Sequence, residues 1–451
     1  MPDMRFLPVD YHSEVARELV DFFHSFYRFG AASNVFDLSD PQYAQFLHNV
    51  LFGSLAVGAV VFLALCVIVA RRCFLHIRSA YARRQRLESN TTELAVVLLM
   101  TFIAVSALSG LLGEAQVDYS VGVVHHAMTN ASERFGDAHA LAANGVLASD
   151  AVRTRADNLV VSFNESELPT EAFKLSVEAL RLLHSSKELV NATDAQLPND
   201  YGDMVTQWRV SYFMLKSATN AAILSVALSS FLLISSIGWS MVTPLRLSIL
   251  ILLSVIPVSH TLIGVYLSST IMTSDFCAAP GNATATLLRP NAAVTYFLEC
   301  RANASSPLLA PAASVFEDAK RVGALQQQLE VFAGKHPDVG VRMKSDFLDP
   351  IGDQLESIDT FLAAYNKTQA CNATARSYEH AVGAFCEYGM LGFFSMWVHQ
   401  ILLCLFLFVG VVASVLAYER VHIREIRTNV QYQLLSSYED DNMEHVYLSA
   451  D

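Results

Sequence analysis

Five long apolar runs dominate the pattern of hydrophobic and polar positions. Each is about 20 residues long, which is the length of helix that crosses a bilayer core of about 30 Å. Within lipid such a run has to be helical, because no water is there to satisfy exposed backbone groups. The pattern therefore predicts an all-α polytopic membrane protein with five transmembrane helices. The runs are Asn49 to Ala70, Leu94 to Leu112, Ala218 to Trp239, Leu247 to Ser268 and Leu391 to Ala417, and none contains Asp, Glu, Lys or Arg.

The composition excludes several other classes of protein. Of 451 residues, 53% are hydrophobic and only 16% are charged, against about 25% charged in soluble proteins. A soluble fold of this size would need more charge on its surface, and a disordered or collagen-like chain would be less apolar. The formal net charge of −13 repels phosphate, so no nucleic acid partner is expected.

Arginine placement predicts how the chain is oriented. The segment 71–93 is rich in arginine, and three more arginines follow the fifth run. Because positive loops stay in the cytoplasm, the sequence predicts a plasma-membrane protein with an extracellular N-terminus. The extracellular parts are then 1–48, 113–217 and 269–390, and the cytoplasmic parts are 71–93, the short loop 240–246 and the acidic tail 418–451. We expect the tail beyond Gln431 to be disordered.

Glycosylation sequons support the same orientation. Eight Asn-x-Ser/Thr sequons occur, and only Asn90 lies in a predicted cytoplasmic loop. A single sequon is weak evidence, but this segregation agrees with the arginine rule. The chain is therefore expected to be a glycoprotein. The extracellular sequons are Asn130, Asn164, Asn191, Asn282, Asn303, Asn366 and Asn372.

Four of the seven cysteines lie in the second extracellular segment: Cys277, Cys300, Cys371 and Cys386. An even number in an oxidising compartment indicates two disulfides, with three connectivities to choose from. We favour the nested pairing, Cys277–Cys386 with Cys300–Cys371. Cys277 closely follows the fourth run and Cys386 closely precedes the fifth, so both should lie near the membrane surface within reach of each other.

Both extracellular segments show apolar residues at spacings of three and four, which is typical of helices. Pro337 and Pro350 are expected to end or begin helices. The segments should therefore form a helical, disulfide-bonded ectodomain. One expected stripe is Phe173, Val177, Leu180 and Leu183; the others are Val322, Leu325, Leu329 and Phe332, and Phe347, Ile351, Leu355, Ile358 and Leu362.

Candidate chemistry is sparse. No phosphate-binding, dinucleotide-binding, zinc-protease, C-x-x-C or G-x-S-x-G motif is present, so we do not expect an enzyme. Glu114 and Asp118 are four residues apart, hence on one helical face, just after the second run. Carboxylate oxygens so placed suit Ca²⁺, although two ligands are too few and a solvated acidic cap explains them equally well.

Two further features are candidates for function. His260, near Pro257, and His399 lie within predicted spans, where an ionisable group invites a functional hypothesis; neutral histidines bonded to neighbouring helices are the alternative. Arg209 and Lys216 stand at the outer end of the third span and could line an anion path. Alternatively, their long side chains anchor the helix at the head groups.

The pattern resembles the Tweety family of membrane proteins over nearly the whole chain. The most specific local match is Thr273–Pro280, which reads TSDFCAAP and resembles the family's S-D-F-C-x-A-P. The segment 296–300, YFLEC, is similar to the family's Y-Y-L-x-C. Further matches are Cys371, Tyr378, Cys386 and Gly389, then Trp208, Arg209 and Tyr212, and before the first span Phe36, Asp40 and Tyr43.

The resemblance implies a homodimer, the nested disulfides, and extracellular Ca²⁺ near the dimer contact above the second span. It also implies a chloride channel, opened by swelling or Ca²⁺. The Arg-Gly-Asp found in several members is absent here; Arg153 and Arg155 are nearby but do not match it. The alternative is a non-channel glycoprotein that binds lipid or a partner protein through its ectodomain. A role in adhesion or signalling has little support beyond the glycans.

Overall fold

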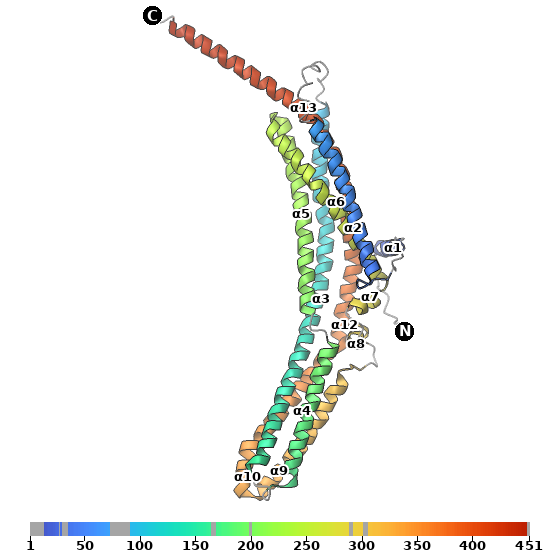
Figure 1. The fold of residues 1–451 in the computed structure, drawn as a ribbon, viewed down its shortest axis with the longest axis vertical. Coiled ribbons are helices and arrows are strands. Elements are labelled where there is room, and N and C mark those ends of the chain that lie inside the picture. The colour runs from blue at the N-terminus through green and yellow to red at the C-terminus, as the bar shows by residue number, and fades with distance from the viewer. Residues whose placement is uncertain are drawn as a thin grey trace. The chain divides into compact units, whose positions relative to one another are not determined.

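The computed structural model describes residues 13–26, 28, 35–72, 91–163, 168–197, 201–287, 292–300 and 305–448. All regular elements in these ranges are helices (Figure 1). They are α1 (Glu14–His24), α2 (Pro41–Ala70), α3 (Thr91–Ser162), α4 (Thr170–Gln196), α5 (Tyr201–Trp239), α6 (Val242–Ala278), α7 (Pro280–Leu287), α8 (Ala292–Glu299), α9 (Leu309–Lys335), α10 (Pro337–Met343), η4 (Lys344–Leu348), α11 (Asp349–Thr368), α12 (Cys371–Ala384), η5 (Phe385–Gly389) and α13 (Met390–Leu448).

The chain divides into two compact units, which are described separately. The span unit holds the described residues of 11–121, 210–278 and 385–451. The loop unit holds those of 122–209 and 279–384. The two units correspond to the apolar runs with their flanks and to the two long loops, so the hydrophobic pattern alone separates them.

Five helical stretches are long and apolar enough to cross a membrane, and each of the five apolar runs lies in one of them. The all-α, five-span class predicted from the sequence is therefore confirmed. The first of these helices, α2, begins where Asp40 accepts a hydrogen bond from the backbone N–H of Gln42 at 2.9 Å. Pro41 follows at the first helical position, where its missing N–H costs nothing.

In the span unit, α2 and α13 both pack against α6. Glycines allow two close approaches. A Cβ added to Gly58 of α2 would lie 2.4 Å from the Cβ of His260, and one added to Gly110 of α3 would lie 2.5 Å from Nε2 of His399. His260 Nδ1 also lies 3.0 Å from the Ile256 carbonyl oxygen. Both histidines therefore pack closely against neighbouring helices, and Nε2 of His399 is buried without a hydrogen-bond partner among the described residues.

The loop unit is built around α4 and α9, which pack against each other, and α11. The two stripes predicted in its second segment lie in or against the core, with Val322, Leu329 and Ile358 fully buried. Pro337 and Pro350 stand in the first turns of α10 and α11, as predicted.

The stripe predicted on α4 was wrong. Phe173, Val177 and Leu180 are 37%, 60% and 52% exposed, and only Leu183 of that stripe is buried. The core instead uses the neighbouring face, whose small alanines let α4 approach α9 closely. That face is Ala172, Leu175, Ala179, Leu182 and Leu189.

The expectation of a disordered tail was also wrong, because α13 continues through Gln431 to Leu448. The four loop cysteines form the nested pairs. Cys277 joins Cys386 inside the span unit with Cα atoms 5.5 Å apart. Cys300 joins Cys371 inside the loop unit with Cα atoms 5.4 Å apart.

The described sequons all lie on helices of the loop unit. Four are exposed, and Asn130 on α3 is partly buried. Asn164 and Asn303 lie outside the described residues, as does Asn90. Use of these sites stays a prediction. The four exposed sequons are Asn191, Asn282, Asn366 and Asn372.

Candidate functional site

The two carboxylates predicted to bind metal form one cluster with a lysine predicted to attract anions. Glu114 and Asp118 lie one turn apart on α3, in the span unit. The Nζ atom of Lys216, on α5, is 3.0 Å from Asp118 Oδ1. The Tyr212 hydroxyl donates to the same oxygen at 3.0 Å. We call this group, with Asn220, the acidic cluster.

Burial differs sharply within the acidic cluster. The side chains of Asp118 and Lys216 are 49% and 34% exposed, so their ion pair is within reach of water. Glu114 is only 8% exposed. Its Oε1 accepts a hydrogen bond from Asn220 Nδ2 at 3.0 Å, whereas Oε2 is buried without a hydrogen-bond partner among the described residues. A buried oxygen in that state is costly and would be stabilised by a cation.

The acidic cluster fits part of a Ca²⁺ shell. Ca²⁺ takes about six to eight oxygen ligands, and the described residues hold no group of three or more His, Cys, Asp or Glu arranged for a metal. Glu114 Oε2 offers one free ligand oxygen. An ion at Asp118 would compete with Lys216, which contacts Oδ1, for the charge of that carboxylate. The remaining ligands would have to come from water or from a second copy of the chain.

Arg209 does not join this cluster. It lies two helical turns before Lys216 on α5, is exposed, and is the last residue of the loop unit on that helix. The basic residue that contacts Asp118 is Lys216. Of the two cations that the sequence grouped as one anion path, Lys216 is the one that belongs to the acidic cluster.

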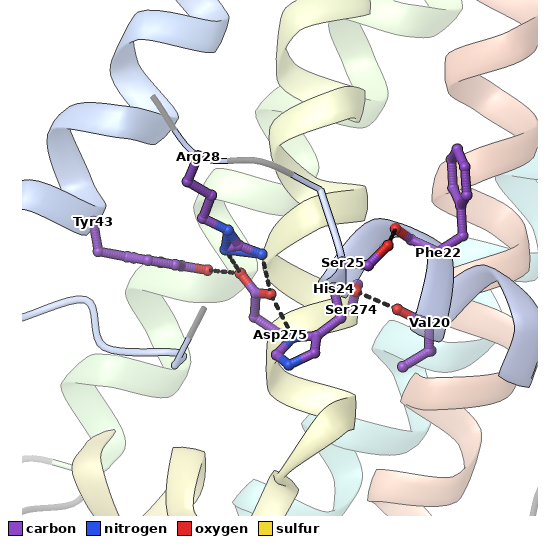
Figure 2. Close-up of polar contacts among 8 residues, drawn as sticks. All are labelled: Val20, Phe22, His24, Ser25, Arg28, Tyr43, Ser274 and Asp275. Carbon is purple, nitrogen blue, oxygen red and sulfur yellow. Dashed lines mark hydrogen bonds and ion pairs between the residues drawn. The ribbon is translucent and has the colours of Figure 1, made fainter. Parts of the chain in front are cut away.

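A second polar cluster, which the sequence did not predict, surrounds Asp275 near the end of α6 (Figure 2). Arg28 binds both carboxylate oxygens, with Nη1 donating to Oδ2 at 2.6 Å and Nη2 donating to Oδ1. The Tyr43 hydroxyl donates to Oδ2 at 2.8 Å, and His24 Nδ1 lies 3.0 Å from Oδ1. Asp275 is 2% exposed and Arg28 is 4% exposed. Such a forked pair is both strong and geometrically specific.

The run Ser274–Cys277 bonds in turn to three other parts of the span unit. Ser274 Oγ donates to the Val20 carbonyl oxygen of α1 at 2.8 Å. Asp275 holds Arg28 and the start of α2, and Cys277 is bonded to Cys386. Phe276 packs on Phe36 and Phe385, with ring centroids 5.7 and 5.6 Å away. This run is thus the anchor of the N-terminal segment.

One sequence signal could have revealed the Asp275 cluster. An acid within an otherwise apolar helix needs a cation if it is buried, and 1–48 contains few arginines. Spacing gave no help, because Arg28 and Asp275 are 247 residues apart.

Comparison with known proteins gives one result. The family model of Tweety matches residues 13–433. That range includes both clusters, the two disulfides and all five apolar runs. No curated protein matches the chain.

Proposed function

Because this chain belongs to the Tweety family, we propose that it is a plasma-membrane anion channel, with chloride as the first candidate ion and the acidic cluster at its entrance. The observation that carries the proposal is the 3.0 Å contact between Lys216 Nζ and Asp118. The cation suited to attract an anion is held by a carboxylate suited to hold Ca²⁺. One residue pair can therefore link the two predicted activities.

In this proposal, the ion pair between Lys216 and Asp118 must break before Lys216 can attract an anion. While Lys216 is bonded to Asp118, the two charges cancel at a distance and an approaching anion meets little positive potential. A partly exposed pair is worth only about 0–1 kcal/mol, so little energy is needed to open it. With Asp118 neutralised, Lys216 presents its full charge and raises the local anion concentration.

Glu114 and Asp118 are the residues that would hold Ca²⁺, and the ion would supply the charge that competes with Lys216. The free Oε2 of Glu114 supports this assignment. Ligands from a second copy would complete the shell, which agrees with the homodimer implied by the family. Swelling is a second candidate stimulus, and it requires no ion at this position.

Chloride flux from liposomes containing the purified, glycosylated protein tests the proposal, with and without external Ca²⁺ and an osmotic gradient. Wild type should pass chloride faster with Ca²⁺. Lys216→Gln should lower the flux, and Lys216→Arg, the matched control, should retain it. Asp118→Asn should give flux without Ca²⁺, because Lys216 is then free.

Equal flux from wild type and Lys216→Gln would remove Lys216 from the path. The absence of flux from a folded protein under every condition would overturn the channel itself. Any anion current that depends on this protein in cells would then have to pass through another protein that it regulates.

A second candidate function, binding of lipid through the loop unit, is favoured by the exposed face of α4. Phe173, Val177 and Leu180 form an apolar stripe that is open to solvent in the single chain. An acyl chain could cover that stripe. Mass spectrometry of the purified protein should then find lipid that Phe173→Asp with Val177→Asp removes and Lys174→Asp retains. Equal lipid in all three proteins would dismiss this face as the site.

A further inference from the structure

We propose that α1 is an interfacial helix that buries Val15, Phe22 and Phe26 among zwitterionic lipids. The leaflet concerned surrounds the end of α6 and the start of α13, which is the outer leaflet in the predicted orientation. The first observation is the distribution of side chains around α1. Its polar residues, Glu14, Arg17, Glu18, Asp21 and His24, occupy one side, and its apolar residues occupy the other. A helix of that kind lies in the plane of a membrane surface.

The apolar side of α1 is wider than the part of it that packs against the rest of the protein. Its inner edge, Ala16, Val20 and Phe23, is at most 3% exposed. Its outer edge is open, with Val15 and Phe22 each 57% exposed and Phe26 41% exposed. A helix that faced water on this edge would not need three large apolar residues there.

The contacts of Phe23 set the depth of α1 in the bilayer. Its ring lies 5.8 Å from that of Trp397 and 5.9 Å from that of Phe394. Both partners lie in the first turns of α13, inside the apolar run from Leu391 to Ala417. Trp is typical of the level where head groups meet acyl chains. An exposed side chain on α1 at this level therefore faces lipid.

The Asp275 cluster holds α1 at that level. Ser274 bonds to Val20, Asp275 bonds to His24 on α1, and Arg28 fixes the chain that leaves it. Figure 2 shows the Phe22 ring pointing away from Asp275. The outer edge of α1 cannot turn toward the protein without breaking these bonds. We therefore infer that lipid covers Val15, Phe22 and Phe26.

The charge of α1 specifies the kind of lipid. The helix carries three acids and one arginine in addition to His24. A net negative helix gains nothing from an anionic surface. Binding should rest on apolar area, in a bilayer of phosphatidylcholine alone.

Quenching by brominated lipid tests the proposal in the full-length protein. Phe22→Trp adds a fluorophore on the outer edge, and Arg17→Trp, the matched control, adds one on the polar side. In phosphatidylcholine vesicles brominated in the acyl chains, the emission that Phe22→Trp adds over wild type should be blue-shifted, and about half or more of it quenched. High salt and added anionic lipid should not change this. Arg17→Trp should be quenched far less.

Three results would overturn the proposal. Unquenched, red-shifted emission from Phe22→Trp would place the residue in water. Blue-shifted emission that bromine does not quench would mean that protein covers this edge. Equal quenching of Phe22→Trp and Arg17→Trp would show that α1 does not lie with one face toward lipid. Elution of both variants like wild type in size-exclusion chromatography ensures that folded protein is compared.

Discussion

Asp275 shows at the residue scale what one buried charge requires. Its carboxylate is satisfied by Arg28, Tyr43 and His24, all from the N-terminal segment. Removing one partner of a buried pair leaves the other charged and desolvated, at a cost of about 3–5 kcal/mol. We therefore expect Asp275→Ala to lower the free energy of unfolding by about that much. Thermal unfolding in detergent measures it.

The matched control is Asp21→Ala, because Asp21 is an exposed acid on α1. It should change stability by about 0.5 kcal/mol or less. The double variant Arg28→Met with Asp275→Leu should recover most of the loss, since it removes both charges together. If Asp275→Ala unfolded like Asp21→Ala, the pair would not be the anchor of the N-terminal segment.

The same residues show what a single sequence can and cannot predict. Asp118 and Lys216 were both identified from the sequence, but for separate roles, because local spacing says nothing about a contact between α3 and α5. Asp275 and Tyr43 were both part of the motifs that indicated the family, yet Arg28, the ion-pair partner of Asp275, was not identified as a candidate. The nested disulfides were predicted, because the outer pair of cysteines flanks apolar runs whose ends must lie at the membrane surface; the Lys216–Asp118 and Arg28–Asp275 contacts have no such constraint and were not predicted.

At the scale of elements, glycines control how closely the helices of the span unit approach. Gly58 faces His260 so closely that an added Cβ would lie 2.4 Å from the histidine Cβ, which cannot move without the backbone of α6. We expect Gly58→Ala to destabilise the span unit by about 1–3 kcal/mol through overpacking. Thermal unfolding monitored by the exposure of Cys66, a free cysteine on α2, would measure it.

Gly53 provides the control on the same helix, because nothing lies within 4 Å of a Cβ added there. Gly53→Ala should be neutral or stabilise α2 by up to about 1 kcal/mol, through helix propensity. A Gly58→Ala protein as stable as Gly53→Ala would mean that α2 and α6 are not in close contact at His260.

Helices were easier to predict than the faces they bury. The stripes predicted on α9 and α11 lie in or against the core, as predicted. On α4 the apolar arc is wide enough to hold two stripes, and the prediction chose Phe173, Val177 and Leu180, which are exposed. The fold instead buries Ala172 and Ala179, since small side chains permit a short distance to α9. Whether the faces of two helices complement each other in size cannot be predicted from the sequence of either helix alone.

At the scale of the whole molecule, each unit contains its own disulfide, and both bonds require an oxidising compartment. Cys277 and Cys386 stand at the end of α6 and just before α13, so those two helix ends should lie on the oxidising side of the membrane. The arginines that follow α2 and those in the tail belong on the other side. These facts together predict an extracellular N-terminus.

Glycosylation in cells tests this topology. Removing N-glycans should shift the mobility of the protein, and Asn→Gln changes at Asn191, Asn282, Asn366 and Asn372, all exposed on helices of the loop unit, should reduce that shift one step at a time. Asn90→Gln is the internal control and should have no effect, because cytoplasmic sequons meet no transferase. A glycan at Asn90 would show that the orientation is the reverse of the predicted one. The acidic cluster would then face the cytoplasm, and any Ca²⁺ that acts on Glu114 and Asp118 would have to come from inside the cell.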